Sequence, residues 1–280
     1  MLPGVYLAQK KNGEIYYRAS VTYNGKHISL GSYHKEAYAN QAYHLACDVV
    51  ADPSPWTVER YQADCILSFE KWVVLINFRD NKIYFKNPIY LKKRYFLYYI
   101  DKESCLKFDA EDLFYYAHHK IMKRGGHLFV SDYGMQVNIL SRYGIKNYAV
   151  PGRDYIFANG DESDFGYNNI EIVNRYHGVS RIQLKGQPKY QAKIHINGDY
   201  LIGRYQTEAE AAIAYNKAAL ILRNHGFDKN YPQNFIEGVN EIAYASLYQK
   251  LRISKKLLAF AEEFTNGNYT HKSSPMLCDQ

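Results

Sequence analysis

The chain has 280 residues, which is enough for two or three small domains. Hydrophobic residues make up 47% and charged residues 22%, so the composition excludes wholesale disorder and allows real cores. The formal net charge is +7, and 29 residues are tyrosine, whose ring packs while its hydroxyl stays polar. This composition fits surfaces that bind partners, and it fits equally well an AT-rich coding sequence with tyrosines in ordinary cores.

The cysteine pattern and the hydropathy of the chain indicate its environment. None of the four cysteines forms a Cys-x-x-Cys pair, which argues against a zinc knuckle. The apolar run from Trp72 to Ile76 is too short to cross a membrane, and the N-terminus lacks the pattern of a secretion signal. We therefore expect a soluble cytoplasmic protein that uses no cofactor or metal. Cys105 and Cys278 remain candidates for linking subunits, although buried or idle thiols are more common.

Residues 1–53 predict three strands followed by a helix. Val5–Gln9, Ile15–Tyr23 and Lys26–Leu30 have strand character, and Asn24-Gly25 is a strong signal for a tight hairpin turn. A helix is expected from Lys35 to Val50. Its small apolar face, which lets it lie close to the sheet, consists of Ala39, Ala42, Ala46 and Val49.

Residues 54–174 are rich in aromatic side chains and predict a mixed α+β region. The strand-like pieces are Trp72–Asn77, Lys82–Phe85 and Tyr95–Ile100.

Residues 175–238 repeat the plan of the first module. Asn197-Gly198 is the hairpin turn, and Thr207 is the expected N-cap of a helix with Glu208 and Glu210 in its first turn. The expected apolar face of this helix consists of Ala211, Ala214, Ala218 and Ile221.

Residues 239–265 predict two further helices, Glu241–Arg252 and Ser254–Phe264. Their apolar residues are expected either to dock on the body of the protein or to join subunits into a homo-oligomer. Residues 266–280 have the small and polar composition of a flexible tail.

The two modules share an ordered pattern of Gly-Val, Tyr-x-Ala and Leu/Ile-Gly-x-Tyr. It consists of Gly4-Val5, Tyr17-Arg18-Ala19 and Leu30-Gly31-Ser32-Tyr33 in the first copy, and of Gly178-Val179, Tyr190-Gln191-Ala192 and Ile202-Gly203-Arg204-Tyr205 in the second. With the Ala-rich stretch Thr207–Tyr215 and the trailing Asn234-Phe235, the pattern resembles the AP2/ERF domain. That resemblance implies a DNA-binding module in which a three-stranded antiparallel sheet packs on one helix. The first copy departs from it at Tyr38 and Asn40, where alanines are usual.

Residues 157–170 read Phe-Ala-Asn-Gly-Asp-Glu-Ser-Asp-Phe-Gly-Tyr-Asn-Asn-Ile. They resemble the centre of the HNH nuclease motif, His-x-Asn-Gly-x-x-x-Asp-Asn-x-x-x-Asn-Leu, with Asn159-Gly160, Asp164 and Asn169-Ile170 at matching spacing. The resemblance implies a ββα domain over about residues 140–174. Many phage HNH homing endonucleases carry an AP2 module directly after this motif, as Gly178-Val179 follows here.

Two departures from the HNH motif argue against catalysis. Phe157 stands where the general base is histidine, and Phe165 stands where an asparagine fixes the loop around the metal. Phenylalanine can neither accept a proton nor bind a cation, so we expect a non-catalytic motif whose two phenylalanines fill the vacated site. The remaining candidate histidines, which we expect to be surface or core residues rather than ligands, are His118, His119, His127 and His177.

The charge distribution separates the two modules. Residues 175–232 contain nine Lys and Arg against four Asp and Glu, whereas residues 1–52 contain five against four. A basic sheet face suits DNA, because Arg and Gln read base edges and Lys contacts phosphates. In the second module, the candidate DNA-binding or partner-binding residues are Arg181, Gln183, Lys185, Lys189, Tyr190, Gln191, Lys193 and His195. In the first, they are Tyr6, Lys10, Arg18 and Ser20, together with Thr22.

Three functions remain open on this reading. The first is a non-catalytic phage-type protein that binds double-stranded DNA and derives from an AP2–HNH endonuclease. The second is a phage inhibitor that uses the same α+β scaffold to bind and block a host defence protein complex, for example a Gabija-type nuclease system. The third, an active HNH nuclease, is the least favoured because of Phe157 and Phe165.

Overall fold

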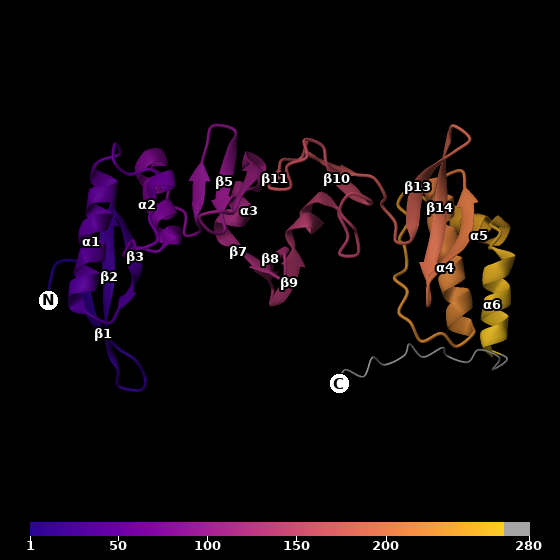
Figure 1. The fold of residues 1–280 in the computed structure, drawn as a ribbon, viewed down its shortest axis with the longest axis horizontal. Coiled ribbons are helices and arrows are strands. Elements are labelled where there is room, and N and C mark those ends of the chain that lie inside the picture. Colours follow the sequence, from indigo (N-terminus) through magenta and orange to yellow (C-terminus); the bar gives the residue numbers. More distant parts are fainter. Residues whose placement is uncertain (266–280) are drawn as a thin grey trace, which may run out of the picture. The chain divides into compact units, whose positions relative to one another are not determined.

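The computed structural model describes residues 1–265 and shows a mixed α+β protein with several small sheets (Figure 1). The chain forms two compact units. Unit 1 comprises Met1–Gly144 and Phe157–Ile170, and unit 2 comprises Ile145–Ile156 and the chain from Glu171 onward. Residues 157–170, which resemble the HNH motif, therefore lie wholly in unit 1, whereas the domain predicted over about residues 140–174 is divided between the two units.

The first module in unit 1 is a three-stranded antiparallel sheet that packs on one helix. Strands β1 (Val5–Gln9), β2 (Ile15–Tyr23) and β3 (Lys26–Tyr33) pair in the order β1-β2-β3, and α1 covers Glu36–Ala51. The predicted strands and helix are confirmed within a few residues. The predicted apolar face of α1 is fully buried, namely Ala39, Ala42, Ala46 and Val49.

The core of this module continues beyond residue 53 into helix α2 (Phe69–Asn81). The predicted strand Trp72–Asn77 is wrong, because these residues lie inside α2. The helix begins after Ser68, whose hydroxyl accepts a hydrogen bond from the Lys71 amide, and it ends at Lys82 in the left-handed region at φ 60°. A continuous apolar run fits a buried helix as well as a buried strand, and this helix is buried on all sides from Trp72 to Arg79.

The rest of unit 1 contains two further sheets and short helices. One sheet has the order β11-β6-β5-β4, from β4 (Ile89–Leu91), β5 (Tyr95–Tyr99), β6 (Cys105–Asp109) and β11 (Asp164–Phe165). The other has the order β7-β8-β9, from β7 (Ile121–Arg124), β8 (His127–Asp132) and β9 (Met135–Asn138), and α3 covers Leu113–His118. The predicted strand at Tyr95 is confirmed, whereas Lys82–Phe85 forms no strand. Three short 3₁₀ helices cover Val58–Arg60, Ala110–Asp112 and Ile139–Tyr143.

Unit 2 is built on a sheet and helix of the same plan as the first module. Strands β13 (Val179–Leu184), β14 (Gln187–His195) and β15 (Asp199–Tyr205) pair antiparallel in that order, and α4 covers Glu208–Asn224. The predicted cap is confirmed. The Thr207 hydroxyl accepts from the Glu210 amide while the Glu210 carboxylate accepts from the Thr207 amide, which is a capping box.

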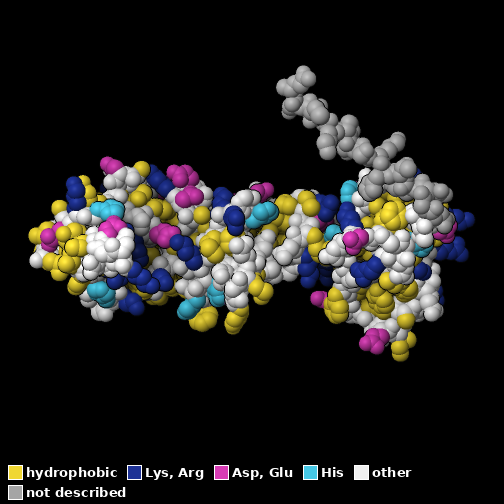
Figure 2. Space-filling view, turned by 90° about the horizontal axis from the view of Figure 1, so that it is seen from below, with side chains coloured by type: hydrophobic (Ala, Val, Ile, Leu, Met, Phe, Trp, Pro, Cys, Tyr) yellow, Lys and Arg dark blue, Asp and Glu magenta, His cyan; other side chains and the backbone are white. Residues whose placement is uncertain are grey.

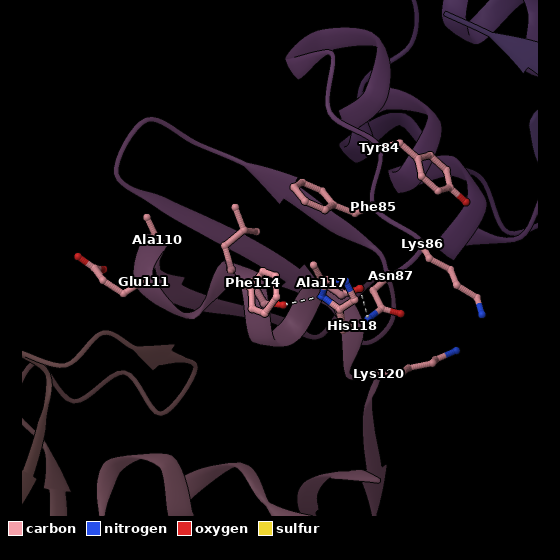
Figure 3. Close-up of a pocket in the computed structure, with 11 residues that line it drawn as sticks. Tyr84, Phe85, Lys86, Asn87, Ala110, Glu111, Phe114, Ala117, His118 and Lys120 are labelled. Carbon is pink, nitrogen blue, oxygen red and sulfur yellow. Dashed lines mark hydrogen bonds between the residues drawn. The ribbon is translucent and has the colours of Figure 1, made fainter. Parts of the chain in front are cut away.

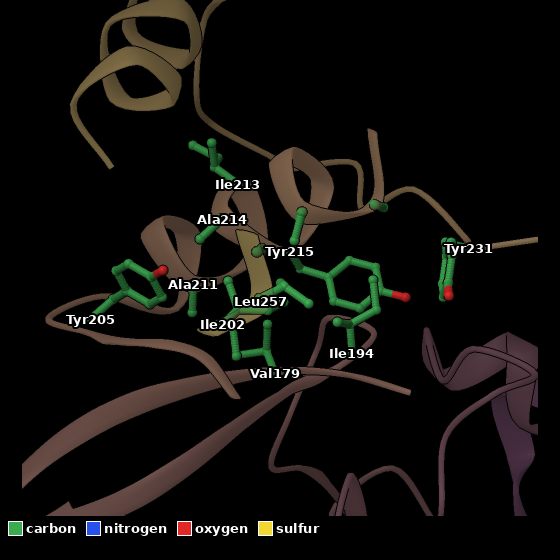
Figure 4. Close-up of a cluster of buried hydrophobic side chains, with 14 of the residues drawn as sticks. Val179, Ile194, Ile202, Tyr205, Ala211, Ile213, Ala214, Tyr215, Tyr231 and Leu257 are labelled. Atoms are coloured by element: carbon green, nitrogen blue, oxygen red, sulfur yellow. The ribbon is translucent and has the colours of Figure 1, made fainter. Parts of the chain in front are cut away.

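Side chains from the sheet and from α4 meet in one buried core (Figure 4). Val179, Ile194 and Ile202 of the sheet face Ala211 and Ala214 of the helix. The small alanines let the helix lie close to the sheet, as the sequence predicts. Ile221 is only partly buried, and its neighbour Leu222 is fully buried instead.

The C-terminal helices α5 (Glu241–Lys250) and α6 (Lys255–Thr265) dock on unit 2. Leu257 and Ala261 of α6 are buried in the core of the module, and the Ser254 amide donates to the Ile202 carbonyl at 2.8 Å. The Lys217 ammonium donates to the carbonyls of Tyr248 and Leu251. The apolar anchors of α6 therefore pack within their own chain, which leaves them unavailable for joining subunits.

The two modules share a close contact between a glycine and a tyrosine ring at matching positions. Gly4 and Gly178 both have φ +71°, and a Cβ atom at either would lie 2.0 or 2.5 Å from ring atoms of Tyr43 or Tyr215. In each module a glutamate in the first turn of the helix also bonds to the segment that precedes the first strand. Glu36 accepts a hydrogen bond from the Leu2 amide, and Glu208 accepts one from the Arg175 amide. The repeat in the sequence is thus a repeat in backbone and packing.

Short strands β10 (Tyr155–Phe157) and β12 (Ile170–Ile172) form a two-stranded sheet.

Across residues 1–265, no helix has the length and apolar character that a membrane crossing requires.

Candidate functional site

The outer face of the second sheet collects basic side chains. Val179, Ala192 and Ile194 are buried against the helix, so the alternation of side chains places their neighbours on the opposite face. On β14 this outer face carries a row that spans about 20 Å at about 3.3 Å per residue. The row consists of four residues that the sequence predicts for the site, namely Lys189, Gln191, Lys193 and His195.

Strand β15 adds Arg204, which is not among the residues predicted for the site. The register places Arg204 opposite Gln191 and Leu201 opposite Lys193, with a β-bulge between these pairs. The extra residue leaves Ile202 and Gly203 together on the helix side, so Arg204 returns to the outer face. Simple alternation counted from Leu201 would place Arg204 inside, and the sequence carries no other signal of the bulge.

Four other predicted residues do not lie in this row. Arg181 pairs with Tyr190, and Gln183 pairs with Pro188. Both residues therefore lie on the same side of β13 as Val179, which is the side that faces the helix. Tyr190 is half-buried against the core. Lys185 lies in the turn between β13 and β14, with φ 52°. These residues share chemical types that suit a binding face, but the strand register decides which side of the sheet each one occupies.

A hydrogen bond between His195 and Asp199 closes one end of the row. His195 Nδ1 lies 2.9 Å from Asp199 Oδ1, and both side chains are exposed. The hydrogen bond from His195 and the nearby Lys193 hold the pKa of Asp199 below its ordinary value. The single carboxylate of this face is therefore paired with His195, and the positive charges of Lys193 and Arg204 carry no ion pair in the described chain.

The matching face of the first module differs in shape and charge. Arg18 lies opposite Tyr6 and Ser32, and Thr22 lies opposite His27. The rings of Tyr6 and His27 come from the strands on either side of β2 and meet edge to face at 6.5 Å. Ser20 lies between Arg18 and Thr22 on β2.

Two residues of the first module do not fit the predicted binding face. Ser20 is 7% exposed, and its hydroxyl has no hydrogen-bond partner among the described residues. Lys10 lies at the turn between β1 and β2, where its ammonium pairs with Glu14 at 2.9 Å. Of the residues predicted here, Tyr6 and Arg18 remain exposed on the outer face together with Thr22.

Phe157 and Phe165 pack together in the segment that resembles the HNH motif. Phe165 is 3% exposed and stacks on Phe108 at 5.2 Å, and its ring meets that of Phe157 edge to face at 5.8 Å. These two side chains thus extend an apolar core. The nearby Asp164 carboxylate accepts from Lys107 at 2.8 Å and from Asn159 at 3.2 Å.

The predicted ββα arrangement is wrong for this segment, because no helix forms in the described chain between Gly144 and Val179. Side chains satisfy the backbone amides instead. Asn159 accepts from the Asp161 amide, Asp161 from the Ser163 amide and Asp164 from the Gly166 amide. Local bonds of this kind compete with helix formation, and Asn169 adds two further bonds, to the carbonyls of Asp161 and Asp164.

Two neighbouring histidines of unit 1 bond to backbone carbonyls of their own helix. His118 and His119 approach the carbonyls of Phe114 and Tyr115 through Nδ1 at 2.8 and 2.9 Å, so Nδ1 must carry the proton. Residues 1–265 contain no cluster of three or more His, Cys, Asp or Glu side chains suited to a metal ion. Cys105 is half-buried, and burial raises the pKa of its thiol to about 11, which lowers its reactivity. Cys278 lies outside the described residues.

Figure 2 shows one face of the molecule, where Lys and Arg side chains are interspersed with apolar and neutral ones.

No protein family model, curated protein or solved structure matches this chain.

Proposed function

We propose that the outer face of the β13–β15 sheet binds double-stranded DNA without cutting it. The observation that carries the proposal is the row of Lys189, Gln191, Lys193 and His195 beside Arg204 on one exposed sheet. The major groove of DNA admits strands, and its base edges offer acceptors to Arg and Gln while phosphates attract Lys. The ancestry we propose is a phage AP2–HNH endonuclease acting in the host cytoplasm, with Phe157 and Phe165 replacing the catalytic groups.

Fluorescence anisotropy with a labelled random-sequence duplex tests the proposal. The affinity should fall steeply between 50 and 200 mM salt, about tenfold or more, because each neutralised phosphate releases counterions. Lys193→Glu should lower the affinity at least about tenfold, since it replaces an attractive charge with a repulsive one. Lys256→Glu on α6 makes the same change in net charge away from the row and should have little effect.

The outcomes of this experiment are distinct. An affinity that is flat with salt would remove the electrostatic basis of the proposal. Equal losses in Lys193→Glu and Lys256→Glu would show that net charge, rather than this face, attracts DNA.

A second candidate function rests on the first module. Its outer face presents Tyr6 and Arg18 and lacks the row of lysines, and tyrosine and arginine are enriched where proteins bind proteins. On this basis the protein is an inhibitor that holds a host defence complex, such as a Gabija-type nuclease. Pull-downs from host lysate with and without DNase separate the two functions, because a stoichiometric protein partner that survives DNase favours the inhibitor.

A further inference from the structure

A cleft of about 730 Å³ lies in unit 1 between the chain at residues 84–87 and helix α3 (Figure 3). Its volume lies within the range of sites that bind small molecules or side chains, about 300–1,000 Å³. Phe85, Leu113, Phe114 and Ala117 supply apolar walls, and a few polar groups stand at the two ends. None of its residues belongs to either sheet face discussed above.

Phe114 is an unusual residue for an exposed helix. Its side chain is 81% exposed and rests against His118 at a ring distance of 4.9 Å, whereas Phe85 on the facing wall is only 8% exposed. A large aromatic ring left in water marks a surface that gains free energy by being covered, about 25 cal/mol for each Å² of apolar area.

Asn87 provides a hydrogen-bond acceptor to the cleft. The residue is 6% exposed, and its amide nitrogen donates to the Tyr116 carbonyl at 2.7 Å. Its side-chain oxygen accepts no hydrogen bond from the described residues, and Figure 3 shows it directed toward the side where Lys86 and Lys120 end. Held in place by its amide, this oxygen suits a backbone N–H of a ligand.

The charges of the cleft are separated along its length. Lys86 and Lys120 lie at one end and Glu111 lies at the other (Figure 3). The nearby Lys71 has a lowered pKa, mainly because of burial and to a smaller extent because of Lys86 and Lys120. Lys120 also pairs with Glu70, so the lining has little net charge. A polyanion such as a nucleic acid would gain little here, whereas a ligand with one or two carboxylates complements the basic end.

We propose that this cleft binds an extended acidic peptide segment of a partner protein. An apolar side chain of the peptide packs between Phe85 and Phe114, a peptide N–H donates to Asn87, and an acidic side chain lies at Lys86 and Lys120. The site is independent of the proposed DNA-binding face, which belongs to unit 2.

Selection of a displayed random-peptide library on the full chain tests this proposal. We expect the enriched peptides to combine Asp or Glu with an aromatic or large aliphatic residue. A labelled enriched peptide should bind at least tenfold more weakly to Phe114→Ala and to Lys86→Glu. Both side chains are exposed, so neither change should unfold the protein, and equal melting temperatures check this. Replacing the acidic residue of the peptide by Lys should restore binding to Lys86→Glu and weaken binding to the unchanged protein.

Matched controls lie in unit 2. Phe235→Ala removes an equally exposed ring, at 84%, and Lys255→Glu makes the same charge change on α6, so both should bind the peptide normally. The proposal is overturned if no peptide is enriched, if the enriched peptides bind all variants alike, or if charge exchange restores nothing. Binding of single-stranded oligo(dT) that is lost in Phe114→Ala would instead assign the cleft to nucleic acid.

Discussion

The two sheet-and-helix modules differ most at a single matching position of their middle strands. Where β14 carries the exposed Lys193, β2 carries the buried Ser20, and each follows an alanine that packs on the helix. The residues that face the helices are similar in the two modules, because they must fill similar spaces. The outer faces carry no such constraint, so a repeat detected from its inner residues does not imply a repeated function.

The largest loss of stability is expected at the matching glycines, Gly4 and Gly178, and it tests whether the two modules pack in the same way. Gly4→Ala and Gly178→Ala should each destabilise their own unit by about 3 kcal/mol or more, because φ is positive and the new methyl group meets Tyr43 or Tyr215. Hydrogen–deuterium exchange followed by mass spectrometry resolves the two units separately. Gly25→Ala, with positive φ but no atom within 4 Å, is the control for backbone strain alone. If either glycine tolerates the change as Gly25 does, the two modules do not share this packing.

A smaller effect is expected at the paired tyrosines that end the sheets. The Tyr33 hydroxyl donates to the Ile66 carbonyl at 3.2 Å, and the Tyr205 hydroxyl donates to the Arg252 carbonyl at 2.9 Å. Burial raises the pKa of Tyr205 to about 12, so this hydroxyl keeps its proton. Tyr33→Phe and Tyr205→Phe should each cost about 1 kcal/mol, because a carbonyl loses its partner. Tyr6→Phe, at an exposed hydroxyl without a hydrogen bond in the described chain, should cost nothing measurable by urea unfolding.

The smallest expected effect is a pH dependence of stability that only the second module shows. Burial and the nearby Arg153 lower the pKa of His177 below its ordinary value of 6.5, and the first module has Pro3 at the matching position. Below pH 6.5 the unfolded chain binds a proton that the folded chain binds less readily, so unit 2 should lose stability as pH falls from 7 to 5. The loss should be under about 1 kcal/mol, since the ring is half-exposed.

His177→Phe removes the titrating group and keeps the ring contacts with Tyr148 and Tyr215. This variant should reduce the pH dependence of exchange in unit 2 and leave unit 1 unchanged. A pH dependence of the same size in the variant would assign the effect to other groups.

The sequence predicts the two modules well because their signals are local. Asn24-Gly25 determines a turn, Thr207 and Glu210 cap a helix, and alanines at helical spacing mark its buried face. The sequence predicts secondary structure poorly where tertiary contacts decide between helix and strand. The run from Trp72 to Asn77 has no periodicity to separate helix from strand, and its burial comes from both α1 and the rest of unit 1.

The site shows the same division between local and tertiary information. Lys189, Gln191, Lys193 and His195 follow from alternation along one strand, and the structure places them together. The outward position of Arg204 depends on a bulge, and the burial of Ser20 depends on the tertiary arrangement of the sheet. Neither feature has a signal within a few residues of sequence.

The path of the chain between the units has a genetic consequence. Residues 145–156 belong to unit 2 and residues 157–170 belong to unit 1, so neither unit is encoded by an uninterrupted stretch. The backbone carbonyl of Asp154, in the first of these segments, accepts hydrogen bonds from the amides of Val173 and Asn174. A recombination event that transferred only the codons after residue 171 would leave this support behind. Unit 2 can therefore move between genes intact only when the codons for residues 145–156 move with it.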